Sequence, residues 1–206
     1  MKVDILDIGS GNISSIKNWI EKANVSTRIV KKPQDIESEI LILPGVGSVG
    51  SYMARIIDGN YDVAIREHLT NGGRLIGICL GFQIMTKYSE EDGGVNCLGL
   101  IDGHVERVDP DISHNGWEPL QFRINEMNKQ SFHNQHKLTK KRVLNGRVFY
   151  NHEYGVVNKE HKSFSTPASS EFPQYDGLFV KDKIIGIQFH PEKSQITGLD
   201  LIRMIL

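Results

Sequence analysis

The chain has 206 residues, the usual length of one domain, and its 24 Lys and Arg residues almost balance its 25 Asp and Glu residues. A formal net charge of −1 gives no reason to expect nucleic acid or an anionic membrane as a partner. The two cysteines, Cys79 and Cys97, are too few for a disulfide framework and are not spaced like zinc ligands.

The apolar runs of the chain are short. None is long enough to cross a bilayer, and the first residues, MKVDILDIG, carry charges that the apolar segment of a signal peptide would lack. Free thiols stay reduced in the cytoplasm. We therefore expect a cytoplasmic protein that forms a single domain over residues 1–206.

The first half of the chain alternates between strand and helix patterns. Short apolar runs predict strands at Lys2–Leu6, 27–30, Ile40–Leu43 and 75–78, and helical spacing of apolar residues predicts a helix over 14–23. Strands of this kind, separated by helices, indicate a parallel sheet that is covered on both faces.

The edge of that sheet is where a binding site is expected. Ligands of such sheets bind beyond the carboxyl ends of the strands. The loops that follow three of the predicted strands contain residues 9–12, 45–50 and Cys79. We expect these three segments to lie close together.

The second half predicts strands joined by turns, partly antiparallel. The expected strands are at 103–108, 120–124, 148–150, 155–157, 178–181 and 184–189. The polar and basic residues 131–142 predict a loop or a solvated helix edge.

The strongest local motif is Gly77-Ile78-Cys79-Leu80-Gly81, which follows a predicted buried strand and precedes a helical pattern. It is the cysteine version of a nucleophile elbow, in which a sharp turn between strand and helix exposes the nucleophile. Glycine on both sides makes room for the turn, and N–H groups at the helix start stabilise a thiolate. The alternative is a buried core cysteine beside a tight turn. Cys97 has no such surroundings and is interpreted as structural.

A thiolate nucleophile requires a base, and His190 is the best candidate among the eight histidines. It follows the apolar run 184–189 and precedes Pro191, which favours an extended conformation at His190. Residues two apart in an extended chain point to the same side, so Glu192 is predicted to orient the His190 ring. The alternative is a histidine at the end of a strand next to a solvated glutamate.

These motifs resemble those of the class I glutamine amidotransferases, and more narrowly those of the glutaminase subunit of imidazole glycerol phosphate synthase. The resemblance implies an α/β fold of the class I glutamine amidotransferase type (flavodoxin-like), a mixed and mainly parallel sheet flanked by helices. It extends over most of the chain. The matching segments are Gly77-Ile78-Cys79-Leu80-Gly81-Phe82-Gln83, Phe189-His190-Pro191-Glu192-Lys193-Ser194-Gln195, Gly9-x-Gly11-Asn12, Pro44-Gly45-Val46-Gly47, Ser89-Glu90-Glu91, Gly99-Leu100-Ile101 and His114-x-Gly116-Trp117.

The resemblance implies a triad of Cys79, His190 and Glu192 that releases ammonia from glutamine through a thioester. The negatively charged oxygen that forms needs two N–H donors. One is the backbone N–H of Leu80, and the resemblance places the other in the loop at Val46 or Gly47. A mobile loop there would make this oxyanion hole conditional on partner binding.

The resemblance also implies residues that hold the glutamine substrate. These are Gly47, Gln83 and Glu91, with Glu91 reading the α-ammonium group. The alternative for Gln83 and Glu91 is a solvated polar helix face.

The implied partner is a cyclase subunit with a (βα)8 barrel, which forms a heterodimer with the glutaminase and uses the ammonia in histidine biosynthesis. Asn12, Tyr150, His152 and Lys193 are expected at the junction, although a solvated surface role is the alternative for Lys193. Neither nucleic acid nor a membrane is expected as a partner.

Some positions depart from the family pattern. Asp7-Ile8-Gly9 replaces Asp-Tyr-Gly, the segment 149–154 differs from the usual Phe-Val-His-Ser-Tyr, and 122–147 matches poorly. These departures leave open a related glutaminase that supplies ammonia for the amidination of a bacterial surface-polysaccharide sugar. A stand-alone cysteine peptidase or amidase, and a non-catalytic binding subunit, are further alternatives.

Two other patterns are weaker. Residues 45–50 fit G-x-G-x-x-G, but they follow a later strand than a dinucleotide site requires and lack an acidic residue at the end of the next strand. His133 and His136, with His152 nearby, lack a third metal ligand at convincing spacing. We expect no metal and no cofactor.

Overall fold

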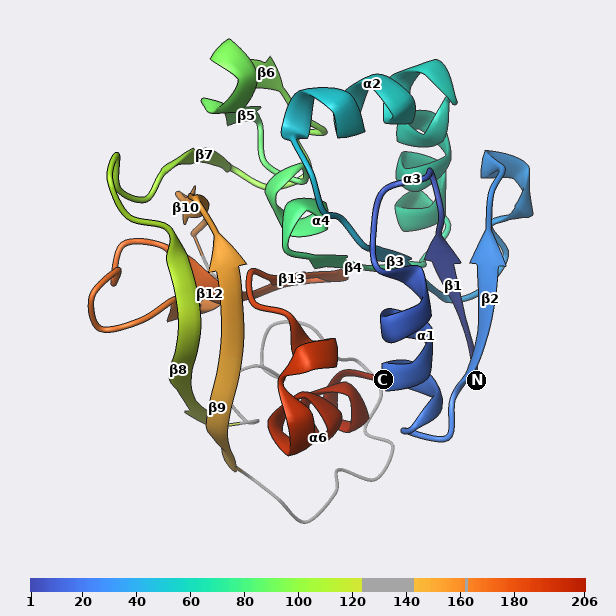
Figure 1. Ribbon diagram of the computed structural model, residues 1–206. Helices are drawn as coiled ribbons and strands as arrows, with labels where there is room; N and C mark the ends of the chain where they lie inside the picture. The colour runs from blue at the N-terminus through green and yellow to red at the C-terminus, as the bar shows by residue number, and fades with distance from the viewer. Residues whose placement is uncertain (124–142, 162) are drawn as a thin grey trace.

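A seven-stranded sheet forms the centre of the computed structural model, which describes residues 1–123, 143–161 and 163–206 (Figure 1). The strand order is β11-β12-β13-β4-β3-β1-β2, with the strands from β13 to β2 parallel and β11 and β12 antiparallel. The strands are β1 (Lys2–Leu6), β2 (Ser26–Val30), β3 (Ile40–Leu43), β4 (Arg74–Ile78), β11 (Phe164–Pro167), β12 (Asp176–Lys181) and β13 (Ile184–Ile187).

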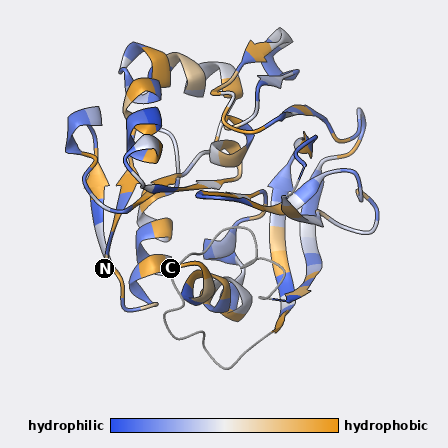
Figure 2. Ribbon diagram, turned by 180° about the vertical axis from the view of Figure 1, so that it is seen from behind, coloured by the Kyte–Doolittle hydropathy of each residue, from blue (hydrophilic) through white to orange (hydrophobic). Residues whose placement is uncertain are grey.

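Helices cover both faces of this sheet, as the continuous apolar strands predict. In β3, Ile40 and Ile42 pack toward α1 and α6, whereas Leu41 and Leu43 pack toward α2, α3 and α4. Each such side chain contributes roughly 2 kcal/mol through burial, before the entropy cost of folding. The helices carry both apolar and polar residues, which is typical of helices with one buried face (Figure 2). They are α1 (Ile13–Glu21), α2 (Val49–Asp58), α3 (Tyr61–Thr70), α4 (Leu80–Gln83) and α6 (Gln195–Ile205).

Two smaller sheets flank the central one. The first has the order β10-β7-β5-β6, and the second is the antiparallel ribbon of β8 and β9. The ribbon is attached to the rest of the molecule through α6, because the N–H of Arg147 donates to Thr197 Oγ1 at 3.2 Å. The strands are β5 (Tyr88–Ser89), β6 (Val95–Asn96), β7 (Gly103–Arg107), β8 (His114–Arg123), β9 (Val143–His152) and β10 (Tyr154–Asn158).

The structure confirms the strands and the helix predicted in the first half of the chain, to within two residues at each end. In the second half, residues 120–123 of the predicted run 120–124 lie in the ten-residue strand β8, and 148–150 lie in the ten-residue strand β9. Residue 124 lies outside the described residues. The predictions for 131–142, including His133 and His136, lie outside the described residues. Within the described part of the chain, no helix has the length and apolarity needed to cross a membrane.

The helix after Cys79 is shorter than its apolar pattern indicates, since α4 ends at Gln83. The cause lies in the segment that follows. The N–H of Leu98 donates to the carbonyl of Ile84 at 2.8 Å, and the N–H of Leu100 donates to that of Met85 at 2.8 Å. These carbonyl groups are therefore bound by a distant loop instead of by the next helical turn.

Candidate active site

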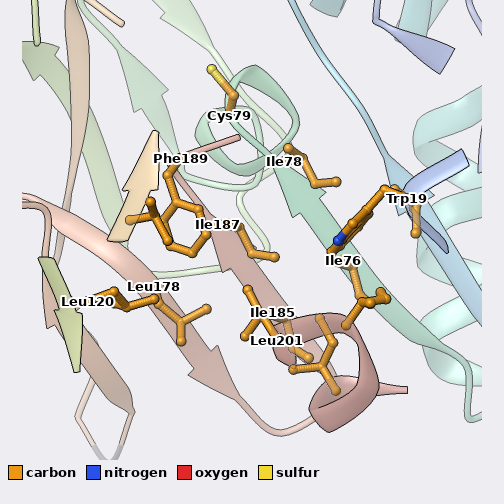
Figure 3. Packing of buried hydrophobic residues seen from close by; sticks show 14 of the residues in the cluster. Trp19, Ile76, Ile78, Cys79, Leu120, Leu178, Ile185, Ile187, Phe189 and Leu201 are labelled. Atoms are coloured by element: carbon orange, nitrogen blue, oxygen red, sulfur yellow. The ribbon is translucent and has the colours of Figure 1, made fainter. Parts of the chain in front are cut away.

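Cys79 lies at a sharp turn between β4 and α4. Its backbone has φ 53° and ψ −111°, a conformation that costs a non-glycine residue about 1–3 kcal/mol. A Cβ on Gly77 would lie 2.5 Å from the carbonyl oxygen of Gly81, and one on Gly81 would lie 1.8 Å from that of Leu43. The structure thus confirms the crowding expected at both glycines. The Cys79 side chain points away from the apolar side chains below it (Figure 3).

His190 and Glu192 form a buried pair. His190 Nδ1 lies 2.9 Å from Glu192 Oε1, and the two side chains are 5% and 1% exposed. His190 has the extended backbone predicted for it, but Glu192 lies in the 3₁₀ turn η3 (Pro191–Lys193). The expectation that an extended chain would align the two side chains is therefore wrong. The turn that begins at Pro191 aligns them instead, because proline suits the first position of a helical turn.

His190 also contacts the nucleophile. Burial lowers the pKa of His190, whereas interactions with Cys79 and Glu192 raise it by more. The net result is a pKa of about 9, above the usual 6.5 of histidine. The arrangement thus stabilises a positively charged imidazolium next to the sulfur at neutral pH. By contrast, burial raises the pKa of Cys97 to about 11, which makes that thiol a poor nucleophile.

The loops at the carboxyl edge of the sheet meet as expected. Ser10 Oγ donates to the carbonyl of Val46 at 2.5 Å, and a Cβ on Gly45 would lie 2.7 Å from Cβ of Leu80. Gly47 has φ +107°, a conformation that glycine adopts without strain. Leu80 is the first residue of α4, so its N–H has no partner within the helix. The loop that contains Val46 and Gly47 therefore packs against the start of α4, the residue after Cys79.

Glu91 lies at the N-terminal end of α2. Its Oε2 accepts a hydrogen bond from the N–H of Val49 at 3.3 Å, and Asp92 Oδ2 accepts one from Gly50 at 2.8 Å. Burial raises the pKa of Glu91, the bond from Val49 lowers it, and the charge of Asp92 raises it. The carboxylate predicted to read an ammonium group is thus next to the loop that contains Gly47.

Gln83 is buried, with only 4% of its surface exposed. Its Nε2 donates to the carbonyl of Tyr154 at 2.7 Å and to Gln188 Oε1 at 3.3 Å. The alternative of a solvated helix face is therefore wrong for Gln83. Both amide N–H groups of Gln83 are therefore used inside the protein.

The residues expected at a partner junction divide into two groups. Asn12 and Lys193 are exposed, and Lys193 Nζ lies 5.6 Å from the centre of the Phe149 ring. Tyr150 is 0% exposed and His152 is 8% exposed, so the prediction that they lie at the junction is wrong.

The cause of this error is the register of β9. Side chains alternate between the two faces of a strand, and in β9 the even-numbered residues point inward. Phe149 and Asn151 occupy the outer face beside Tyr150 and His152.

Gln188 is a buried polar residue that the sequence analysis missed. It is 0% exposed, and its Nε2 lies 3.8 Å from Cys79 Sγ. The available signal was a polar residue within the apolar run 184–189, because such a residue requires a partner when its strand is buried on both faces. Among the described residues, no group of three or more His, Cys, Asp or Glu side chains is placed to hold a metal ion.

Known proteins are similar to this chain in sequence and in fold. The model of the family glutamine amidotransferase class-I matches residues 4–202. The imidazole glycerol phosphate synthase subunit HisH of Bacillus subtilis is 30% identical over 97% of this chain and 93% of its own length. A crystal structure of a glutamine amidotransferase has the same fold, with a TM-score of 0.72 at 16% identity over 98% of this chain and 97% of that one.

A fungal relative is longer. The imidazole glycerol phosphate synthase hisHF of Emericella nidulans is 33% identical over 99% of this chain, which spans only 37% of that protein. The family match over nearly the whole chain and the HisH relatives of similar length agree. The chain belongs to the class I glutamine amidotransferase family, in the group that contains the HisH subunits of imidazole glycerol phosphate synthase.

Proposed function

We propose that this chain is the glutaminase subunit of an imidazole glycerol phosphate synthase, in which Cys79, His190 and Glu192 hydrolyse glutamine to glutamate and ammonia. The observation that carries the proposal is the strained nucleophile elbow at Cys79 together with the buried, hydrogen-bonded pair of His190 and Glu192, in a chain of the glutamine amidotransferase family. The names of the HisH relatives support the assignment to this synthase.

The first half of the reaction forms a thioester. The Cys79 thiolate attacks the side-chain amide carbon of glutamine, and the carbonyl oxygen becomes negatively charged. The N–H of Leu80 and an N–H at Val46 or Gly47 stabilise that oxygen. Imidazolium at His190 then gives its proton to the nitrogen, the carbon–nitrogen bond breaks, and ammonia leaves.

The second half returns the enzyme to its starting state. Neutral His190 takes a proton from water, the resulting hydroxide attacks the thioester, and the carbon–sulfur bond breaks. The Cys79 thiolate and the His190 imidazolium are restored, and the new carboxyl group loses its proton to solvent as glutamate leaves. Glu192 keeps the His190 ring oriented through both halves by its bond to Nδ1.

The substrate is held by complementary charge and by hydrogen bonds. The Glu91 carboxylate is suited to the α-ammonium group of glutamine, and the Gln83 oxygen is suited to an N–H of the substrate. Gly47 precedes by two residues Val49, whose N–H donates to Glu91, and its backbone is a further proposed contact for the substrate.

The partner is a separate cyclase subunit with a (βα)8 barrel, which uses the ammonia in histidine biosynthesis. Its proposed contact surface consists of Asn12, Lys193, Phe149 and Asn151. The first two are exposed, and the other two lie on the outer face of β9, where the Phe149 ring is 5.6 Å from Lys193 Nζ. In the fungal relative hisHF, the match to this chain spans 37% of one polypeptide, which leaves room for a second subunit in the same protein.

The experiment measures ammonia release from glutamine by the chain, alone and with the cyclase encoded beside its gene. We expect the partner to increase ammonia release and to form an imidazole product, and we expect Cys79→Ala to abolish both. Release without an imidazole product would indicate another acceptor, such as a polysaccharide sugar. Hydrolysis of peptides with indifference to glutamine would contradict the proposal.

A further inference from the structure

Gln188 is a polar side chain that approaches the nucleophile Cys79 from the end of β13. It follows the last residue of β13 and is fully buried, with its Nε2 3.8 Å from Cys79 Sγ. The backbone fixes both ends of this contact. The N–H of Gln188 donates to the carbonyl of Gly177 at 2.9 Å, and the N–H of Cys79 donates to that of Ile187 at 2.7 Å.

A chain of hydrogen bonds determines which end of the Gln188 amide faces the sulfur. A backbone carbonyl only accepts, so the Gln83 group that lies 2.7 Å from the Tyr154 oxygen must be its NH2. That NH2 also donates to the Gln188 oxygen at 3.3 Å. The remaining end of the Gln188 amide, its NH2, must therefore face Cys79.

The start of this chain is itself held in place. The carbonyl of Tyr154 also lies 2.7 Å from His152 Nδ1, so its two lone pairs meet Gln83 and His152. Gln83, His152 and Gln188 are buried and Tyr154 is half-buried, and hydrogen bonds away from solvent are stronger than in water. Rotation of the Gln188 amide would place an oxygen against the sulfur and an NH2 against the NH2 of Gln83.

An N–H directed at sulfur affects the two forms of the thiol differently. A thiolate accepts such a hydrogen bond strongly, whereas a neutral thiol accepts it weakly. The contact therefore favours the charged nucleophile and fixes the position of Sγ beside His190. No step of the mechanism given above uses Gln188.

We propose that Gln188 is a positioning residue of the glutaminase, whose side-chain N–H holds the Cys79 thiolate, and that Gln83 orients Gln188 through the Tyr154 carbonyl. The catalytic role of Gln188 rests on the proposed glutaminase function. The contact itself can be tested without glutamine.

The test measures the alkylation of Cys79 by iodoacetamide across a range of pH, followed by mass spectrometry of the peptide that contains Cys79. In Gln188→Met, which keeps the length of the side chain but removes the amide, the midpoint of the alkylation profile should rise by about one pH unit. In Gln83→Met the midpoint should rise by a smaller amount, because the Gln188 amide is then free to rotate.

The matched control is Gln121→Met, since Gln121 is an exposed glutamine on β8 away from Cys79. Its profile should coincide with that of the original chain. Urea unfolding establishes that each variant is folded, and Gln83→Met decides the matter if Gln188→Met does not fold. An unchanged midpoint in a folded variant of either residue would overturn the proposal.

Glutaminase kinetics separate this inference from the function on which it rests. We expect Gln188→Met to lower kcat for ammonia release by about tenfold and to leave KM nearly unchanged. If the original chain releases no ammonia with its partner, the proposed function fails. The alkylation profile still decides whether Gln188 holds the thiolate.

Discussion

At the scale of the residue, His190 carries opposing influences. Its side chain is almost completely buried, and burial alone would favour the neutral ring. Hydrogen bonds with Cys79 and Glu192 outweigh burial and raise the pKa of His190 to about 9. The ring therefore holds at neutral pH the proton that the leaving ammonia needs.

Replacing Glu192 by Gln should change the pH dependence of ammonia release. In the original enzyme, kcat/KM should fall above pH 9, because His190 then loses its proton. In Glu192→Gln the pKa of His190 is lower, so we expect the alkaline fall to begin about one pH unit earlier, with activity reduced about a hundredfold. The exposed residue Glu67 supplies the control, since Glu67→Gln should keep the original profile. An unchanged alkaline fall in Glu192→Gln would show that Glu192 does not support His190.

At the scale of the element, the sequence predicts the strands that are buried on both faces and the turns whose glycines are closely packed. Strands such as Ile40–Leu43 are readable because both faces are covered, and the elbow is readable because its glycines meet neighbouring backbone. The ribbon of β8 and β9 has one outer face, so its apolar residues are interrupted and its register is not evident. The family resemblance placed Tyr150 and His152 at the partner junction, and the sequence pattern of this ribbon did not reveal that both side chains point inward.

The close packing of the elbow against β3 gives a prediction for stability. Because a Cβ on Gly81 would lie 1.8 Å from the carbonyl oxygen of Leu43, Gly81→Ala should lower the free energy of unfolding by about 3 kcal/mol. Gly116 is the control, since a Cβ there meets no atom within 4 Å among the described residues. Gly116→Ala should stay within about 0.5 kcal/mol of the original chain. Equal stability of the two variants in urea unfolding would contradict this packing.

At the scale of the whole molecule, a buried histidine pair joins the two strands of the ribbon, and the ring of Phe172, which follows β11, lies 5.1 Å from the ring of His114. His114 Nδ1 lies 3.0 Å from His152 Nε2, and His114 stacks on Tyr150. Short motifs identify the triad because Cys79 is flanked by glycines and because a proline lies between His190 and Glu192. The pair, like the contact between Gln188 and Cys79, depends on the packing of distant strands, which short motifs do not encode.

This pair makes the stability of the fold sensitive to acid. Burial and the nearby His114 lower the pKa of His152 from 6.5 to about 3, although its bond to Tyr154 opposes the shift. The unfolded chain therefore takes up a proton at higher pH than the folded one, so the stabilisation is complete above pH 6.5 and is lost as the pH falls toward 3. At pH 5 the loss should be about 2 kcal/mol.

Urea unfolding between pH 7 and pH 4 measures this loss. In His152→Phe the free energy of unfolding should vary less steeply with pH, because the chain takes up as much as one proton fewer when it unfolds. The exposed residue His161 is the control, and His161→Gln should keep the original slope. An identical slope in His152→Phe would show that His152 does not cause the sensitivity to acid.

The most direct test of the central claim is to trap the intermediate on Cys79. The chain and its cyclase partner are mixed with glutamine, and the reaction is stopped rapidly with acid. The protein is then digested, and the masses of its peptides are measured by mass spectrometry. Our account predicts a γ-glutamyl group on the peptide that contains Cys79, and neither this group nor ammonia release in Cys79→Ala. A γ-glutamyl group on Cys97 instead, or ammonia release that persists in Cys79→Ala, would contradict it.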